Sequence, residues 1–164
     1  MLINVSNVMA RIAAFAAFVA FKQIRTRARL RFWRSHLFSG HAKLDSFADL
    51  LPDLSPARRY LGAQEIPLAQ ITGSVGRCTD FDRAFHPLKA YLCDRWANVF
   101  QLSQSGNLPP IRVYRAGAQY FVEDGHHRVS VARTRGMTSI RAEVWEYTSK
   151  PAAYQQSRLC CLPA

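Results

Sequence analysis

The chain has 164 residues, of which 49% are hydrophobic and 12% aromatic, and it carries a formal net charge of +11. This length favours one compact domain with appendages, and the apolar fraction excludes a wholly disordered chain because it can offset the entropy of ordering a core. The positive potential attracts phosphate in nucleotides, nucleic acids or anionic lipids, although a solvated basic helix would give the same charge balance.

Residues 1–43 are predicted to form an apolar and then basic helical arm, with one long helix or two over residues 8–38. The apolar run over residues 12–21 is shorter than the ~20 residues of a membrane-spanning helix. Most of its flanking charge follows the run, whereas a signal peptide carries charge before it, so secretion is disfavoured.

The basic part of the arm is predicted to contact a polyanion. Successive arginines advance by ~200° around a helix and so do not form one stripe. Packing on the domain or a partner, contact with an anionic membrane surface and non-specific contact with DNA therefore all stay open, as does a homodimer. The arginines concerned are Arg25, Arg27, Arg29, Arg31 and Arg34.

Residues 44–63 are predicted to be a helical connector. Ser55-Pro56 is typical of an N-cap followed by proline at the first helical position, and Gly62 is typical of a helix stop. The segment is expected to be scaffolding.

Residues 64–148 are predicted to form the domain, and residues 149–164 a peripheral tail. Glu65–Leu68 should be extended, with Pro67 at a strand end or sheet edge. Residues 71–77 are expected to be a loop containing two glycines. Apolar residues with helical spacing over residues 88–100 then predict an amphipathic helix that covers a sheet.

The second half of the domain has clearer patterns. Residues 111–115 and 119–123 are predicted to be the strands of a hairpin turned by residues 116–118. Residues 126–135 should form a helix stopped by Gly136, and residues 140–147 a further strand. The expected fold is α+β, a small mixed sheet with packed helices preceded by the helical arm.

A strand that ends in Asp124-Gly125 and runs directly into a helix is predicted to create an anion site. Unpaired N–H groups and the positive end of the helix dipole meet at such a junction, and glycine lets the backbone approach a phosphate. His126, His127 and Arg128 add side-chain donors in the first helical turn.

The segment over residues 120–140, with its G-x-x-R turn at Gly125–Arg128, resembles the nucleotide-phosphate motif of the ParB/sulfiredoxin superfamily. The Glu65–Leu68 segment similarly resembles the opening strand of ParB-like domains. The resemblance covers about half of the chain. It implies a ParB N-terminal-like domain that binds a nucleotide such as CTP, ATP or ADP, in a regulatory or chromosome-partitioning protein with DNA nearby.

The departures from the family patterns are equally informative. ParB partition proteins have G-E-R-R at this turn, which this chain does not match in full. The resemblance therefore does not imply that this chain hydrolyses a nucleotide. Sulfiredoxin has G-C-H-R, and His126 stands where its reactive cysteine would be, so sulfinic acid reduction is not expected. The free serine kinases of the superfamily use an Asp-Gly-His turn, which Asp124-Gly125-His126 matches better.

Three functions therefore remain open: a nucleotide- or phosphate-binding module, a small metal-dependent phosphotransferase or nuclease using the same pocket, and a membrane-surface or scaffold protein whose domain has lost catalysis. In an enzyme, His127, Asp124 and Glu123 would be the catalytic candidates, with Mg²⁺ as the candidate metal and Asp80 and Asp82 as further acids. No metal site of protein ligands alone is predicted. The predicted phosphate contacts are Gly125, His126, His127 and Arg128, with Ser74, Gly76 and Arg77 as a second wall.

The four cysteines, Cys78, Cys93, Cys160 and Cys161, show no spacing typical of a zinc site. We expect reduced thiols and a cytoplasmic protein. The sequence leaves open which nucleotide is bound and whether it is turned over.

Overall fold

The computed structural model describes residues 5–38, 43–106 and 108–150. Within these ranges the chain forms three α-helices and a six-stranded mixed sheet, so the predicted α+β class is confirmed. The elements are α1 (Val5–Phe38), β1 (Asp45–Ser46), β2 (Leu54–Pro67), β3 (Ile71–Ser74), α2 (Cys93–Leu102), β4 (Ile111–Ala116), β5 (Gln119–Asp124), α3 (His126–Thr134) and β6 (Ser139–Ser149).

The sheet has the strand order β1-β3-β5-β4-β6-β2. Strands β1, β3 and β5 are mutually parallel, β4 is antiparallel to β5 and parallel to β6, and β2 is antiparallel to β6 at the edge. Helix α3 directly follows β5, so its first turn starts at the end of a central strand.

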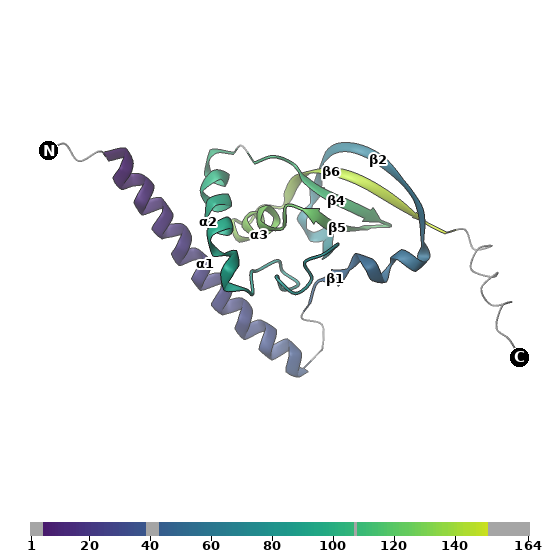
Figure 1. Ribbon diagram of the computed structural model, residues 1–164, viewed down its shortest axis with the longest axis horizontal. Helices are drawn as coiled ribbons and strands as arrows, with labels where there is room; N and C mark the ends of the chain where they lie inside the picture. The colour runs from purple at the N-terminus through teal and green to yellow at the C-terminus, as the bar shows by residue number, and fades with distance from the viewer. Residues whose placement is uncertain (1–4, 39–42, 107, 151–164) are drawn as a thin grey trace, which may run out of the picture.

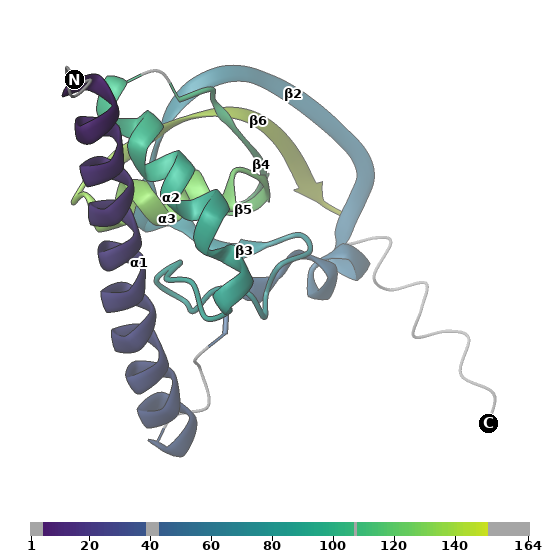
Figure 2. The same ribbon diagram turned by 60° about the vertical axis from the view of Figure 1, so that its left-hand side comes forward.

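The elements are layered, with α3 between the sheet and α2, and with α1 outside α2 (Figures 1 and 2). Alternation along the central strands places Val113, Val122 and Val144 in the core on the helix side of the sheet. Trp96 of α2 is fully buried and donates a 2.9 Å hydrogen bond from its indole nitrogen to Ser130 of α3. A smaller cluster around Phe47 and Phe121 covers the other face.

The predicted N-terminal helical arm is confirmed as one continuous helix, and it packs on the domain. Ala17, Phe21 and Ala28 are buried on the side of α1 that faces the domain. The Phe21 ring lies 5.8 Å from the Trp96 ring, and Arg25 donates a 3.2 Å hydrogen bond to the carbonyl of Leu88. Among the described residues, no helix is long and apolar enough to cross a membrane.

The prediction of a helical connector over residues 44–63 is wrong. This segment contains β1, two short 3-10 turns (Phe47–Asp49 and Leu51–Asp53) and most of β2. Ser55-Pro56 lies in an edge strand, where proline's missing N–H costs little. Gly62 has φ of 88° beside a register shift between β2 and β6, so it marks a bulge and not a helix stop. The predicted domain boundary at residue 64 accordingly falls inside β2.

The later elements were predicted more closely. The hairpin β4–β5, helix α3 with the stop at Gly136, and strand β6 are confirmed within two residues. Helix α2 is confirmed but begins at Cys93, after a 3-10 turn. The loop expected over residues 71–77 is wrong in its first half, because Ile71–Ser74 is the strand β3. Cys160 and Cys161, with most of the predicted tail, lie outside the described residues, while Cys78 and Cys93 are free thiols.

Candidate functional site

The junction between β5 and α3 depends on Gly125. This residue has φ of 103° and ψ of 19°, a left-handed conformation that side chains other than glycine rarely adopt. A Cβ atom at this position would lie 2.4 Å from Cγ2 of Ile111. Both the backbone conformation and the close approach of β4 therefore require glycine, which allows the chain to turn from strand to helix within one residue.

The first turn of α3 opens onto a cavity of about 260 Å³. Gly125 is the N-cap of the helix and offers no side-chain acceptor, so the N–H groups of the first turn lack a capping partner. The positive end of the helix dipole adds to their attraction for an anion. The cavity is lined by Arg77, Arg95, Val99, Glu123, Asp124, Gly125, His126, His127 and Arg128.

His126 is held by Ser74, the last residue of β3. The Ser74 hydroxyl accepts hydrogen bonds from the backbone N–H groups of Gly76 and Arg77, at 3.2 and 2.9 Å, and lies 2.7 Å from Nε2 of His126. With both lone pairs used, the hydroxyl donates its proton to Nε2, which assigns the proton of the neutral ring to Nδ1. Burial, followed by the charge of Arg77, lowers the pKa of His126 to about 4.

His127 is equally buried, but its ring has no such partner. Both ring nitrogens are shielded from solvent and lack a hydrogen bond to any described residue. The ring meets Phe81 edge-on at 5.5 Å. Burial, and then the charges of Arg95 and Arg77, lower the pKa of His127 to about 4, so the ring is neutral and offers one donor and one acceptor.

Arg128 lies at the predicted position but is already engaged by the protein. One guanidinium nitrogen donates to the carbonyl groups of Pro109 and Pro110, at 2.7 and 2.6 Å, and the other donates to Asp124 at 2.5 Å. The predicted grip of this guanidinium on two phosphate oxygens stays a prediction, and it would require these contacts to rearrange. Arg128 lines the cavity as a clamp that fixes the start of α3.

The two carboxylates of the site are likewise occupied. Asp124 pairs with Arg128, while Glu123 accepts a short hydrogen bond from the Tyr114 hydroxyl and lies 3.6 Å from Arg112. The second oxygen of Glu123 is buried without a hydrogen bond, so the Arg112 contact is an ion pair only. Neither acid is poised as a free base in this arrangement.

The remaining cations of the cavity are Arg77 and Arg95. Arg77 lies 3.6 Å from Asp80, too far for a close hydrogen-bonded pair, and its side chain is 43% exposed. Arg95 projects from α2 on the same helical side as Val99, which also lines the cavity. Sequence reasoning missed Arg95, because only the packing of α2 beside α3 brings it to the turn.

The other predicted site residues do not reach the cavity. Ser74 positions His126 and the Arg77 loop, and neither Ser74 nor Gly76 lines the cavity. Asp82 accepts hydrogen bonds from the N–H groups of Ala84 and His86 and so caps a turn. None of the arginines predicted to contact a polyanion, all of them on α1, lines the cavity. Among the described residues, no group of three histidine, cysteine or acidic side chains is arranged to hold a metal ion.

A larger cavity of about 770 Å³ lies beside the first one, and Arg128 lines both. Its walls combine apolar side chains such as Leu108, Met137 and Ile140 with the charged side chains of Glu65 and Arg141. A ligand larger than a phosphate therefore has a second surface within reach of the turn.

Comparison with known proteins gives little further support. No family model matches the chain, and no curated protein matches it. Among solved structures, the crystal structure of sulfiredoxin from Arabidopsis thaliana is similar, with 20% sequence identity over 61% of this chain and 98% of that chain, at a TM-score of 0.39. A similarity this low carries no argument about activity, so the functional conclusion depends on the residues of the turn.

Proposed function

We propose that this chain is a phosphate-binding domain whose ligand is a nucleotide or a similar phosphorylated small molecule, held at the start of α3. The observation that carries the proposal is the buried ring of His127, whose nitrogens have no hydrogen-bond partner among the described residues. A buried polar group without a partner costs about 1–3 kcal/mol. Because both nitrogens are shielded from solvent, a ligand in the cavity that His127 lines would reach them only after the ring turns toward it, and a hydrogen bond formed there would remove that cost.

The charges around His127 support an anionic ligand. Arg77 lines the cavity from the loop after β3, Arg95 lines it from α2, and the uncapped N–H groups belong to the first turn of α3. Asp124 pairs with Arg128 and Glu123 with Arg112, so an arginine offsets the charge of each acid that lines the cavity. A neutral His127 can donate to a phosphate oxygen through one nitrogen and accept from a ligand hydroxyl through the other.

A nucleotide is the ligand class that fits best. The resemblance of the turn to the nucleotide-phosphate motif of the ParB/sulfiredoxin superfamily supports a phosphate ester. The larger cavity lined by Leu108, Met137 and Ile140 supports an apolar base or sugar attached to it. A regulatory or partition-related role would follow from such binding, with nucleotide as the signal.

Binding is proposed ahead of phosphotransfer because of the acids. A kinase-like reaction needs a carboxylate free to accept the proton of a substrate hydroxyl and a divalent metal held near the phosphates. Glu123 is engaged by Tyr114, and Asp124 by Arg128. A metal-dependent phosphotransferase would have to break these contacts on binding its substrates, so it remains the second candidate.

The proposal is tested by isothermal titration of the full chain with inorganic phosphate, pyrophosphate, CTP, ATP and ADP, with and without Mg²⁺. We expect saturable binding of at least one nucleotide. His127→Leu and Arg95→Ala should each weaken it by about tenfold or more, the usual effect of losing a hydrogen bond to a charged group. Arg31→Ala, on the exposed surface of α1, is the charge-matched control and should bind as the parent does.

His127→Leu also controls for folding, because the substitution removes no hydrogen bond between described residues. Its thermal midpoint should equal or exceed that of the parent. Absence of binding to all five ligands, or unchanged binding by His127→Leu, would overturn the proposal. Release of phosphate or transfer to a hydroxyl that requires Mg²⁺ would move the assignment to the phosphotransferase.

A further inference from the structure

Helix α1 carries an apolar surface on the side that faces away from the domain. At 100° per residue, positions 8, 12, 15, 30 and 33 fall within about 60° of the helix circumference. The side of α1 that contacts the domain, with Ala17, Phe21 and Ala28, is roughly opposite. The exposed large apolar side chains of α1 are Val8, Met9, Ile12, Phe15, Phe18, Leu30 and Trp33.

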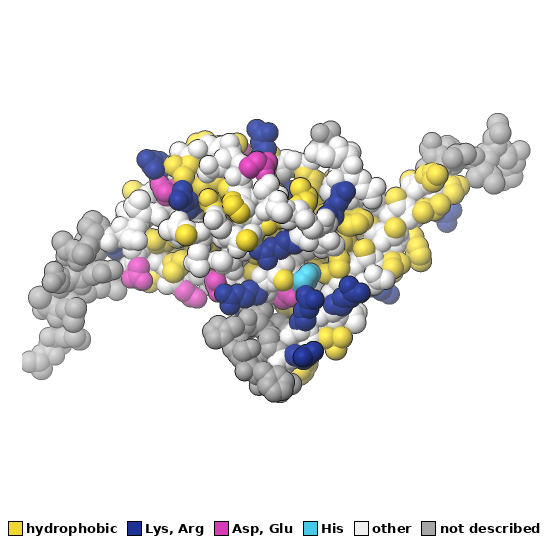
Figure 3. Space-filling model, turned by 180° about the vertical axis from the view of Figure 1, so that it is seen from behind, with side chains coloured by type: hydrophobic (Ala, Val, Ile, Leu, Met, Phe, Trp, Pro, Cys, Tyr) yellow, Lys and Arg dark blue, Asp and Glu magenta, His cyan; other side chains and the backbone are white. Residues whose placement is uncertain are grey.

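This surface is large for a helix that faces solvent. Phe15 is 69% exposed, and Trp33, which also lines a cavity with Cys78 and Leu88 at the edge of the domain, is 65% exposed. The exposed apolar side chains lie in two groups, over residues 8–18 and 30–33, with Lys22, Gln23 and Thr26 between them. Grouped exposed apolar side chains are uncommon on monomeric proteins and mark an interaction site. In the space-filling view, the projecting N-terminal half of α1 shows mainly hydrophobic side chains, while Lys and Arg side chains gather toward the lower edge of the molecule (Figure 3).

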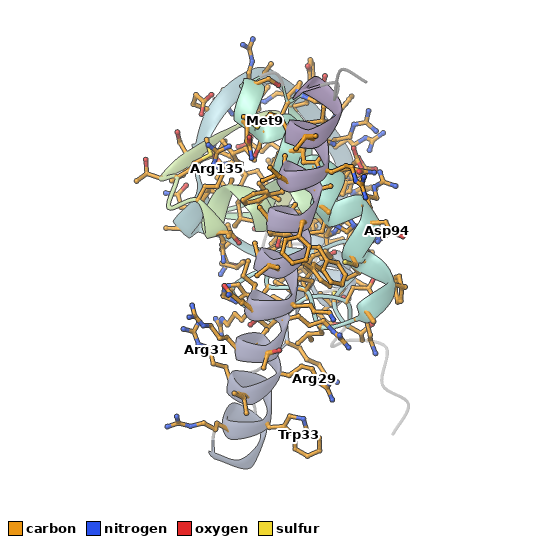
Figure 4. All side chains as sticks on the ribbon, turned by 90° about the vertical axis from the view of Figure 1, so that its left-hand side faces the viewer. Met9, Arg29, Arg31, Trp33, Asp94 and Arg135 are labelled. Carbon is orange, nitrogen blue, oxygen red and sulfur yellow. The ribbon has the colours of Figure 1, made fainter. Side chains whose placement is uncertain are left out.

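The charge of α1 is entirely positive. The helix contains seven lysine and arginine residues and no aspartate or glutamate. By helical angle, exposed cations border the apolar stripe on both sides: Arg11, Lys22 and Arg29 on one, Arg27 and Arg34 on the other. Lys22 lies 4.7 Å from the ring centre of Phe18. Figure 4, which looks onto α1, shows Arg29 and Arg31 projecting to opposite sides, with Trp33 near the C-terminal end of the helix.

We propose that the outer face of α1 docks on an anionic lipid bilayer, with the helix lying in the plane of the membrane surface. An apolar stripe bordered by cations matches such an interface, because the apolar side chains enter the acyl region while lysine and arginine reach the headgroups. Tryptophan and phenylalanine favour this boundary as well. The buried side of α1 would keep its contacts with α2.

The same features disfavour the other occupants of this face. A second copy would bring two helices of uniformly positive charge together, and like charges repel across an interface. The phosphates of a nucleic acid would pair with the arginines. The same charged backbone would, however, lie against the apolar side chains of Ile12, Phe15 and Leu30. An anionic membrane satisfies both the charge and the apolar surface.

Vesicle co-sedimentation of the full chain tests the proposal. We expect binding to phosphatidylcholine vesicles that contain roughly 30% phosphatidylglycerol, and little binding to phosphatidylcholine alone. The bound fraction should fall in about 0.5 M NaCl, because salt screens the attraction between the arginines and the headgroups. A blue shift of tryptophan fluorescence on binding should be lost in Trp33→Phe, since Trp96 is buried in the domain and Trp145 packs on the face of the sheet opposite the helices.

The double variant Ile12→Gln/Phe15→Gln should reduce the partition coefficient by about tenfold or more. Both side chains are exposed, so the fold is retained, which circular dichroism checks. Leu102→Gln, an exposed apolar position at the end of α2, is the matched control and should bind as the parent does. Three outcomes would overturn the proposal: no binding to the anionic vesicles, a dimer that the double variant abolishes, or binding to duplex DNA without binding to vesicles.

Discussion

The Ser74 hydroxyl lies 2.7 Å from Nε2 of His126 and joins the end of β3 to the first turn of α3. The same oxygen accepts the N–H groups of Gly76 and Arg77, so one buried side chain fixes a histidine tautomer and also places the loop that carries Arg77. Two strands that are neighbours in the sheet thus contribute to one site, β5 through the helix that follows it and β3 through its last residue.

Ser74→Ala should lower the free energy of unfolding by about 2–3 kcal/mol, because it leaves His126 and two backbone N–H groups without their acceptor or donor. Thr72→Val is the matched control on the same strand. The Thr72 hydroxyl is buried without a hydrogen bond to any described residue, so this change should be neutral or stabilising. Urea unfolding of both variants measures the difference. Equal losses would show that the Ser74 network contributes nothing.

Gly125→Ala should be severely destabilising. The substitution combines a left-handed backbone, which costs about 1–2 kcal/mol for a non-glycine residue, with a contact to Ile111 that cannot be relieved without moving β4. Gly117→Ala, in the hairpin turn, shares the positive φ but would place its Cβ in open space. We expect the first variant to lose at least about 2 kcal/mol more than the second by chemical unfolding. A smaller difference would contradict the close approach of β4.

Arg128→Lys should destabilise the domain by about 2 kcal/mol, because a lysine cannot reproduce the forked contacts to Pro109, Pro110 and Asp124. Arg135→Lys is the control, since Arg135 is exposed and its guanidinium donates hydrogen bonds, among the described residues, to Ser103. Its loss should stay below about 1 kcal/mol. Thermal unfolding separates the two. If Arg128→Lys keeps full stability but loses nucleotide binding, Arg128 contacts the ligand and does not act as a structural clamp.

The parts of the fold that sequence predicted well are those with local signals. Signals within a few residues predict each of these parts. Alternation predicts the hairpin over residues 111–124, Asp-Gly predicts the turn at Gly125, and Gly136 marks the end of the helix that follows. The connector was mispredicted because Ser55-Pro56 and Gly62 are equally compatible with a helix and with a bulged edge strand. Only pairing with β6, about 90 residues later, decides between them.

The site shows the same division between local and distant information. The sequence predicted Gly125, His126 and His127 as site residues because they adjoin one another. It could not show that Arg128 turns back onto Pro109 and Pro110, or that Arg95 arrives from α2. The neighbouring protein groups that a cavity side chain contacts decide what else it can bind. Packing of distant segments decides which groups those are.

The two histidines make stability depend on pH in a definite direction. Their pKa is about 4 in the folded domain, against about 6.5 in the unfolded chain, so below pH 6.5 the unfolded chain binds more protons. The free energy of unfolding should therefore fall as the pH drops through the window from 6.5 toward 4.

Between about pH 7.5 and pH 5, each histidine should contribute a loss of up to about 2 kcal/mol, which urea unfolding at several pH values measures. His127→Leu removes one of the two groups and should roughly halve the slope. That change leaves Ser74 and His126 in place, so the remaining slope reports on His126. A parent protein with equal stability at both pH values would show that folding does not lower the pKa of either ring. The buried, neutral His127 on which ligand binding depends would then be excluded.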